Sequence, residues 1–172
     1  MDADHQHFQM WYKRILEKLY DDPHAGFPIL MITFPLLERY LREKSQSYED
    51  KSVNDNFHYE LIKIFPEIGS IENSKSFWRI YRHGILHQAT LSSQDKTLSG
   101  CLTKLNDSIR VDTGGTIYIY PTNFSKKVIM TIENDFYTFT AAHSTNHMLA
   151  VVSNLGNGDH GTSGSGSPGI NP

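Results

Sequence analysis

The spacing of apolar residues most limits what this chain can fold into, because that spacing changes twice along the sequence. Four segments place apolar side chains three or four residues apart, as on one face of a helix: residues 7–19, 28–44, 54–65 and 74–91. Two short alternating runs, SIRVD and TIYIY, then flank a Gly-Gly turn and predict a β-hairpin. Helical spacing returns over residues 123–139. The pattern predicts a mainly α protein, a bundle of about five helices with a small β-hairpin inserted before the last helix.

Capping residues and prolines indicate where these helices begin and end. Asn54 or Asp55 can cap the third helix, and Pro66 ends it. Ser74 can cap the fourth helix. Pro35 lies inside the second helix and is expected to kink it or to reset its start. The apolar face expected of the first helix consists of Phe8, Trp11, Tyr12, Ile15 and Leu19.

Length and composition indicate one domain. A chain of 172 residues with 12% aromatic residues can build a core of its own. Residues 1–152 are expected to form the helical domain, and the Gly- and Ser-rich residues 153–172 a flexible tail. The longest apolar stretch, FPILMITFPLL, has 11 residues and two prolines, too few to cross a bilayer. The first residues lack the features of a signal peptide, so we expect a cytoplasmic protein with no membrane partner.

Charge and cysteine content exclude some classes of function. A single cysteine excludes an intramolecular disulfide and a cysteine-based zinc cluster. A net charge of −3 argues against a general nucleic-acid coat but allows one local basic site. The basic residues that we expect on solvated helix faces are Lys13, Arg14, Lys18, Arg39 and Arg42. The tryptophans Trp11 and Trp78 are interpreted as core residues rather than as base-stacking surfaces.

The segment Tyr81–His87 concentrates residues that can carry chemistry. Arg82 supplies a permanent cation whose planar fork binds phosphate bidentately, and His83 and His87 supply groups that titrate near neutrality. Such a set suffices to cleave a phosphodiester without a metal. In an α-helix, however, Arg82 and His87 lie about 140° apart around the axis and about 7.5 Å apart along it. They can converge if the arginine curls around the helix, or if a second copy of the helix faces the first across a two-fold axis.

This segment resembles the motif of the HEPN domain family, an arginine and a histidine separated by four to six residues. In that family Asn, Asp or His often follows the arginine, and here the motif reads Arg82-His83-Gly84-Ile85-Leu86-His87. The resemblance implies a compact helical bundle, frequent homodimerisation through the motif helix and, in active members, metal-independent endoribonuclease activity. It implies that Arg82 and His87 are the catalytic pair and that His83 is the polar neighbour that orients them.

Several active members of that family also carry an acidic residue on an earlier helix. In LLERYLREK, Glu38 is the plausible match, and Glu43 is the alternative. A carboxylate at this position would orient the arginine or the histidine. The resemblance further implies RNA or a nucleotide as ligand, no cofactor, a role in toxin or phage-defence systems, and an antitoxin-type protein partner.

Two other interpretations stay open. One is a catalytically silent HEPN-like module that binds a nucleotide or a protein. The other is a metal-binding bundle, because His83 and His87, like His143 and His147, have the i, i+4 spacing of zinc ligands. Against a metal, Gly84 stands where the glutamate of an HExxH motif would be.

Overall fold

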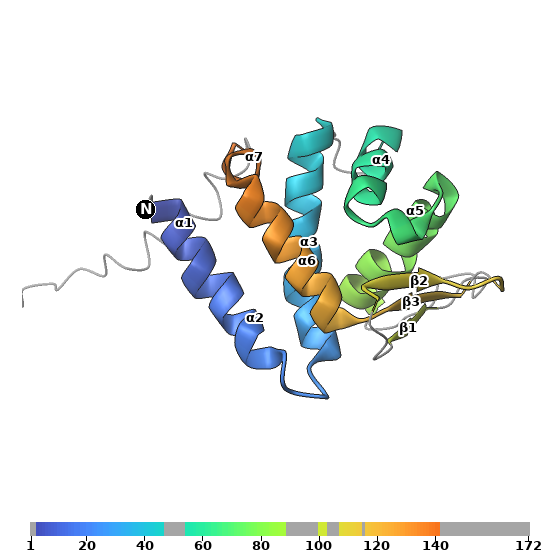
Figure 1. Ribbon diagram of the computed structural model, residues 1–172, viewed down its shortest axis with the longest axis horizontal. Coiled ribbons are helices and arrows are strands. Elements are labelled where there is room, and N and C mark those ends of the chain that lie inside the picture. Colours follow the sequence, from blue (N-terminus) through green and yellow to red (C-terminus); the bar gives the residue numbers. More distant parts are fainter. Residues whose placement is uncertain (1–2, 47–53, 89–99, 103–106, 115, 142–172) are drawn as a thin grey trace, which may run out of the picture. The chain divides into compact units, whose positions relative to one another are not determined.

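The computed structural model describes residues 3–46, 54–88, 100–102, 107–114 and 116–141 (Figure 1). The chain divides into two units, residues 1–142 and 143–172, and all described residues belong to the first. The expected boundary between residues 152 and 153 therefore lies outside the described residues, as does the expected tail.

The described unit is mainly α, as the sequence predicts. One helical rod at the N-terminus consists of α1 (Ala3–Phe8), the π-helical segment η1 (Gln9–Lys13) and α2 (Arg14–Leu19). The other elements are α3 (Gly26–Ser45), α4 (Asp55–Ile64), the 3₁₀ turn η2 (Pro66–Ile68), α5 (Ile71–Phe77), the π-helix η3 (Trp78–Gln88), β1 (Gly100–Leu102), β2 (Ile109–Val111), β3 (Ile117–Ile119), α6 (Pro121–Asn134) and α7 (Phe136–Thr140).

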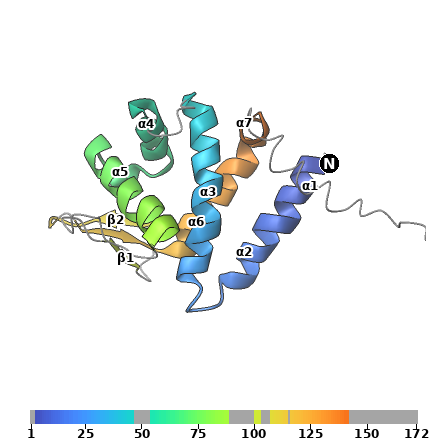
Figure 2. The same cartoon turned by 180° about the vertical axis from the view of Figure 1, so that it is seen from behind.

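Helix α3 is the central element of this unit. It contacts α2, α4, α6, α7 and η3, and it runs beside α6 in both views (Figures 1 and 2). Its buried residues come from adjacent stripes that together form one broad face of the helix. Phe34 of α3 contacts Trp78 and Tyr81 of η3 through ring centroids 5.8 and 6.4 Å apart. This aromatic packing fixes the face of η3 that lies against α3.

The predicted hairpin is present and has an additional strand. β2 and β3 pair antiparallel, and β1 pairs parallel with the other edge of β3, so the order is β1-β3-β2. Asp112 accepts hydrogen bonds from the backbone N–H groups of Gly114 and Thr116, which closes the turn between β2 and β3. The apolar spacing of the sequence gives no sign of β1.

The sheet holds η3 in place. The hydroxyl of Tyr81 donates a 2.6 Å hydrogen bond to the carbonyl of Ile117 in β3. Gly100 of β1 lies so close that a Cβ there would be 2.7 Å from Ile80 and 2.8 Å from Tyr81. Only glycine permits this close approach of β1 to η3. With α3 on one side and the sheet on the other, η3 packs between them.

The expected face of the N-terminal helix is wrong in part. Phe8 is buried as predicted, but Trp11 and Ile15 are 43% and 45% exposed, whereas Leu16 is fully buried. The segment η1 explains the difference, because its i→i+5 turn carries one residue more than an α-helical turn. The next buried apolar residue after Phe8 is therefore Leu16, eight positions later, and not Ile15, seven positions later.

The helix boundaries test the capping predictions. Asn54 caps α4 as predicted, and its side chain accepts from the N–H of Phe57. The Ser74 cap is wrong, because Ser70 caps α5 and Ser74 lies buried inside it, 2.8 Å from His58 Nδ1. Helix α3 starts at Gly26 and continues through the exposed Pro35, so the proline does not reset its start.

The last helical region begins two residues earlier than the apolar spacing indicates. Pro121 stands in the first turn of α6, where its missing N–H costs nothing. The region also divides into α6 and α7 at Asp135. In the described part of the chain, no helix has the length and apolar character needed to span a bilayer.

Candidate functional site

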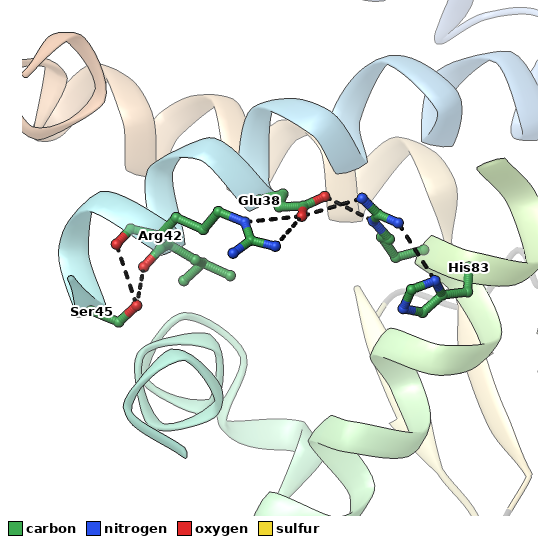
Figure 3. A network of polar contacts seen from close by, with 6 residues as sticks. Glu38, Arg42, Ser45 and His83 are labelled. Carbon is green, nitrogen blue, oxygen red and sulfur yellow. Dashed lines mark hydrogen bonds and ion pairs between the residues drawn. The ribbon is translucent and has the colours of Figure 1, made fainter. Parts of the chain in front are cut away.

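Arg82 of η3 reaches across to Glu38 of α3, where the two helices pack against each other. Its Nε donates to Glu38 Oε2 at 2.8 Å and its Nη2 to Glu38 Oε1 at 3.3 Å (Figure 3). The side chains are mostly buried, with 22% of Arg82 and 13% of Glu38 exposed. This two-oxygen arrangement fixes the plane of the guanidinium as well as its position.

A second arginine binds the same carboxylate. Arg42, one turn after Glu38 on α3, donates from Nε and Nη2 to Glu38 Oε1 at 3.1 and 2.9 Å. Arg42 was expected on a solvated helix face, but only 22% of its side chain is exposed. The sequence contained a signal for this contact, since Glu38 and Arg42 have the i, i+4 spacing of a helical ion pair.

The final turn of α3 supports Arg42. The hydroxyl of Ser45 donates to the carbonyl of Leu41 at 2.6 Å, and it lies 3.5 Å from the carbonyl of Arg42 (Figure 3). Gln46 then ends the helix in a left-handed conformation, and its N–H bonds to the carbonyls of Arg42 and Glu43. These contacts satisfy carbonyls that a helix end leaves open, so the turn that carries Arg42 is well defined.

His83 lies next to Arg82 on the exposed side of η3. Its Nδ1 is 3.5 Å from Arg82 Nη1, the outer limit of a hydrogen bond, and its side chain is exposed (Figure 3). The arginine thus lies between a carboxylate on its buried side and an imidazole on its exposed side. Glu38 and His83, both predicted as supporting residues, are in contact with Arg82, while the alternative Glu43 lies five residues further along α3.

The π-helical form of η3 changes the relation between positions 82 and 87. The α-helical estimate placed these positions about 140° apart around the axis. In a π-helix the backbone hydrogen bonds run from i to i+5, so a residue five positions on lies about one turn away. Position 87 of the backbone is therefore one turn from Arg82 and shares its face. The side chain of His87 lies outside the described residues.

Buried contacts hold this unusual helix. Trp78, Ile80, Tyr81, Gly84 and Ile85 are all buried. Arg82 and His83 lie between these buried positions in the sequence and project from the remaining face. The burial of Gly84 is consistent with a close approach of neighbouring atoms at this position.

The alternative metal site is only partly within the described residues. Among those residues, no group of three or more His, Cys, Asp or Glu side chains is placed to hold a metal ion. His143 and His147 lie outside the described ranges, and so does the side chain of His87. The four-histidine arrangement therefore stays a prediction.

Comparisons with known proteins add no relative. Neither the protein-family models, nor the curated proteins, nor the solved structures contain a match to this chain. The HEPN resemblance rests on the motif at residues 82–87 and on the helical fold.

Proposed function

We propose that this protein is a HEPN-like, metal-independent endoribonuclease in which Arg82 and His87 act on one RNA phosphodiester. One observation carries the proposal: Glu38 orients Arg82 on a helix whose i→i+5 turns bring positions 82 and 87 to the same face. An arginine fixed in this way is preorganised for the charge that develops on a phosphate in the transition state.

The proposed reaction needs no group from outside the protein and its substrate. The 2′-oxygen of a ribose attacks the adjacent phosphorus, the bond from phosphorus to the 5′-oxygen breaks, and a 2′,3′-cyclic phosphate and a 5′-hydroxyl result. His87 transfers the protons, taking one from the 2′-hydroxyl and returning one to the leaving 5′-oxygen. Arg82 stabilises the equatorial phosphate oxygens, and Glu38 and His83 keep Arg82 in place.

A second copy of the chain is the proposed partner. A homodimer through η3 would bring two copies of Arg82 and His87 together, and the resulting site would be cationic although the net charge of each chain is −3. An antitoxin-type protein that covers this site belongs to the same proposal, as does a role in toxin or defence systems in the cytoplasm.

The test is RNA cleavage by the purified full-length protein in the presence of EDTA. We expect cleavage that leaves 2′,3′-cyclic ends, and at least about a 100-fold loss in Arg82→Ala and in His87→Ala. Arg79→Ala is the matched control, since Arg79 is an exposed arginine three residues earlier on η3 and should leave cleavage unchanged. A 2′-deoxy substrate should stay intact. Cleavage that survives either substitution, or that EDTA abolishes, contradicts the proposal.

A catalytically silent binding module is the second candidate. It is favoured by the fact that the guanidinium fork of Arg82 already binds Glu38, as it would in a purely structural ion pair. Intact RNA after long incubation, together with saturable binding of a nucleotide that Arg82→Ala abolishes, would support this module instead.

A further inference from the structure

We propose that Trp11 and Arg14 form a second contact surface for single-stranded RNA, on the side of α3 that also carries the candidate site at Arg82. In this contact surface the indole of Trp11 stacks on a base, and Arg14 binds a phosphate beside it. The inference rests on the proposed function for its ligand class, and it uses residues outside the motif.

The π-helical segment η1 brings Trp11 to the surface. The apolar spacing predicts Trp11 as a core residue, yet 43% of it is exposed. Phe8 and Leu16 are both buried, so the eight positions between them make two turns of about four residues each. Residues four positions apart therefore lie in line on this part of the rod. Trp11 and Ile15 form one such line, and both are almost half exposed.

The side chain of Trp11 points away from α6. Gln9 and Lys13, each two positions from Trp11, both bind Glu133 of α6. With about four residues per turn, two positions correspond to half a turn, so Trp11 lies on the opposite side of the rod. In Figure 2, α3 lies in front of α6, and this side of the rod is turned towards the viewer.

Helix α3 carries an exposed row on the same side. Thr33 of α3 donates to Ser125 of α6 at 2.9 Å, and so marks the side of α3 that faces α6. Pro35 is exposed and lies ~160° from Thr33 around the helix. Met31, one turn earlier, is also exposed, and Glu38 follows Pro35 by three positions in the same row. On the side away from α6, the surface of α3 therefore leads to the carboxylate of the candidate site.

The rod and η3 flank α3 at about the level of Glu38. Arg39 follows Glu38, and its guanidinium carbon lies 4.4 Å from the ring centroid of Phe139. Phe139 contacts Phe8 of the rod through ring centroids 5.4 Å apart, and Phe8 is three residues before Trp11. Helix α3 thus lies between Trp11 and the candidate site, and a helix with its side chains is ~10–12 Å across. A stacked strand of roughly three nucleotides covers this width at ~3.4 Å per nucleotide.

The chemistry of this contact surface favours a single nucleic-acid strand. Every base has a flat face that can stack on an indole, whatever the sequence. Arg14 lies beside Trp11 at i, i+3, and Lys18 lies one turn further on. Both cations are exposed, and within the described part of the chain neither of them forms an ion pair. The exposed acid Glu17 lies in line with Lys13, on the side towards α6. An anionic strand with free bases therefore meets a cation next to an aromatic ring.

The experiment uses 2′-O-methyl RNA hexanucleotides, which have no free 2′-hydroxyl and stay intact. Calorimetry on the full chain gives the affinity, and tryptophan emission reports stacking. The chain has two tryptophans, and Trp78 is only 4% exposed, so a stacked base should quench Trp11 alone. Trp11→Leu keeps an apolar side chain without the ring, and should bind about tenfold more weakly and lose the quenching. Arg14→Ala should weaken binding and lower the salt dependence by about one released counterion.

Two controls separate stacking from general effects. Met130→Ala removes an exposed apolar side chain of α6, and Arg79→Ala removes an exposed arginine of η3; neither should change affinity or quenching. A hexanucleotide with abasic sugars keeps the phosphates but has no bases. It should bind the wild-type protein about tenfold more weakly than the intact strand does, and Trp11→Leu should not distinguish the two strands.

Several outcomes would overturn the inference. They are emission that stays unquenched at saturation, equal affinity of Trp11→Leu and the wild-type protein, or no measurable binding. If Trp11→Leu does not fold, equal affinity of the wild-type protein for the intact and abasic strands overturns it. Self-association that depends on Trp11, without strand binding, would assign this face to a second copy of the chain.

The proposed activity and the contact surface can fail separately. Because the probes cannot be cleaved, quenching by the hexanucleotide with no cleavage of RNA contradicts the proposed activity alone. RNA cleavage whose KM is unchanged in Trp11→Leu contradicts the contact surface alone. We expect this substitution to raise KM and to leave kcat unchanged, since Trp11 binds the strand away from the reacting phosphate.

Discussion

Two carboxylates, Glu133 and Glu38, each connect a π-helical segment to a neighbouring helix, but they bind different kinds of cation. Glu133 of α6 accepts from Gln9 at 2.6 Å and from Lys13 at 2.7 Å, both on η1. It faces one amide and one cation, so that cluster is neutral. Glu38 accepts hydrogen bonds from two arginines, Arg42 and Arg82. The neutral cluster joins η1 to α6 through a lysine, whereas Glu38 joins α3 to η3 through the arginine that our proposal assigns to the phosphate.

The two π-helical segments differ in the same way. η1 shifts the apolar stripe of the N-terminal helix by one residue and turns Trp11 outward. η3 keeps its apolar residues buried against α3 and the sheet, and its wide turns align positions 82 and 87. The same backbone form therefore serves packing in one region and, in our proposal, a reaction in the other.

The largest expected effect comes from replacing the arginine that binds Glu38 by lysine, compared with replacing the lysine that binds Glu133 by arginine. Arg82→Lys keeps the charge but cannot hold both oxygens of Glu38, so we expect RNA cleavage to fall about 10³-fold. Lys13→Arg keeps the charge where one contact suffices, and should change the free energy of unfolding by less than about 0.5 kcal/mol. Cleavage rates and chemical denaturation measure the two effects. Full activity of Arg82→Lys would show that the fork of Arg82 is not used.

A second prediction tests the register of the N-terminal helix. Leu16→Ala should lower the free energy of unfolding by about 3 kcal/mol, because the side chain is fully buried. Ile15→Ala is the matched control, and it should cost less than about 1 kcal/mol because 45% of Ile15 is exposed. Denaturant unfolding measures both. If Ile15→Ala is the more costly change, the helix has the α-helical register that its sequence spacing suggests.

Features that depend on local sequence were predicted well. The apolar spacing correctly identifies the helices and the hairpin, and the Asn54 cap depends only on residues up to Phe57. The Ser74 cap is wrong because Ser70 offers an equally good local signal. The choice between the two serines is made by packing, which buries Ser74 against His58 of α4.

Features that depend on tertiary contacts were not predictable in this way. An i→i+5 turn and an i→i+4 turn accept the same residues, so neither η1 nor η3 was foreseen. The motif resemblance pointed to Glu38, but it contains no position for Arg42. The Arg42–Glu38 contact is a local i, i+4 pair of α3, whereas the contact of Glu38 with Arg82 depends on the packing of α3 against η3.

The smallest predicted effect concerns the neutral cluster at low pH. Burial of Glu133 opposes its ionisation, but hydrogen bonds from Lys13 and Gln9 outweigh burial and hold the pKa of Glu133 below its usual value. A pKa lowered by folding stabilises the protein above the unfolded-state value, and this contribution is lost as the pH falls through the folded-state pKa.

Glu133→Gln should therefore lower the free energy of unfolding by about 1 kcal/mol at pH 7, which is the upper range for a partly exposed ion pair. The difference from the wild-type protein should shrink once the pH falls below about 4.3, where an ordinary glutamate takes up its proton. Urea unfolding of both proteins from pH 7 to pH 3 measures this convergence. A constant difference across that range would mean that the shape of the Glu133 side chain, and not its charge, joins η1 to α6.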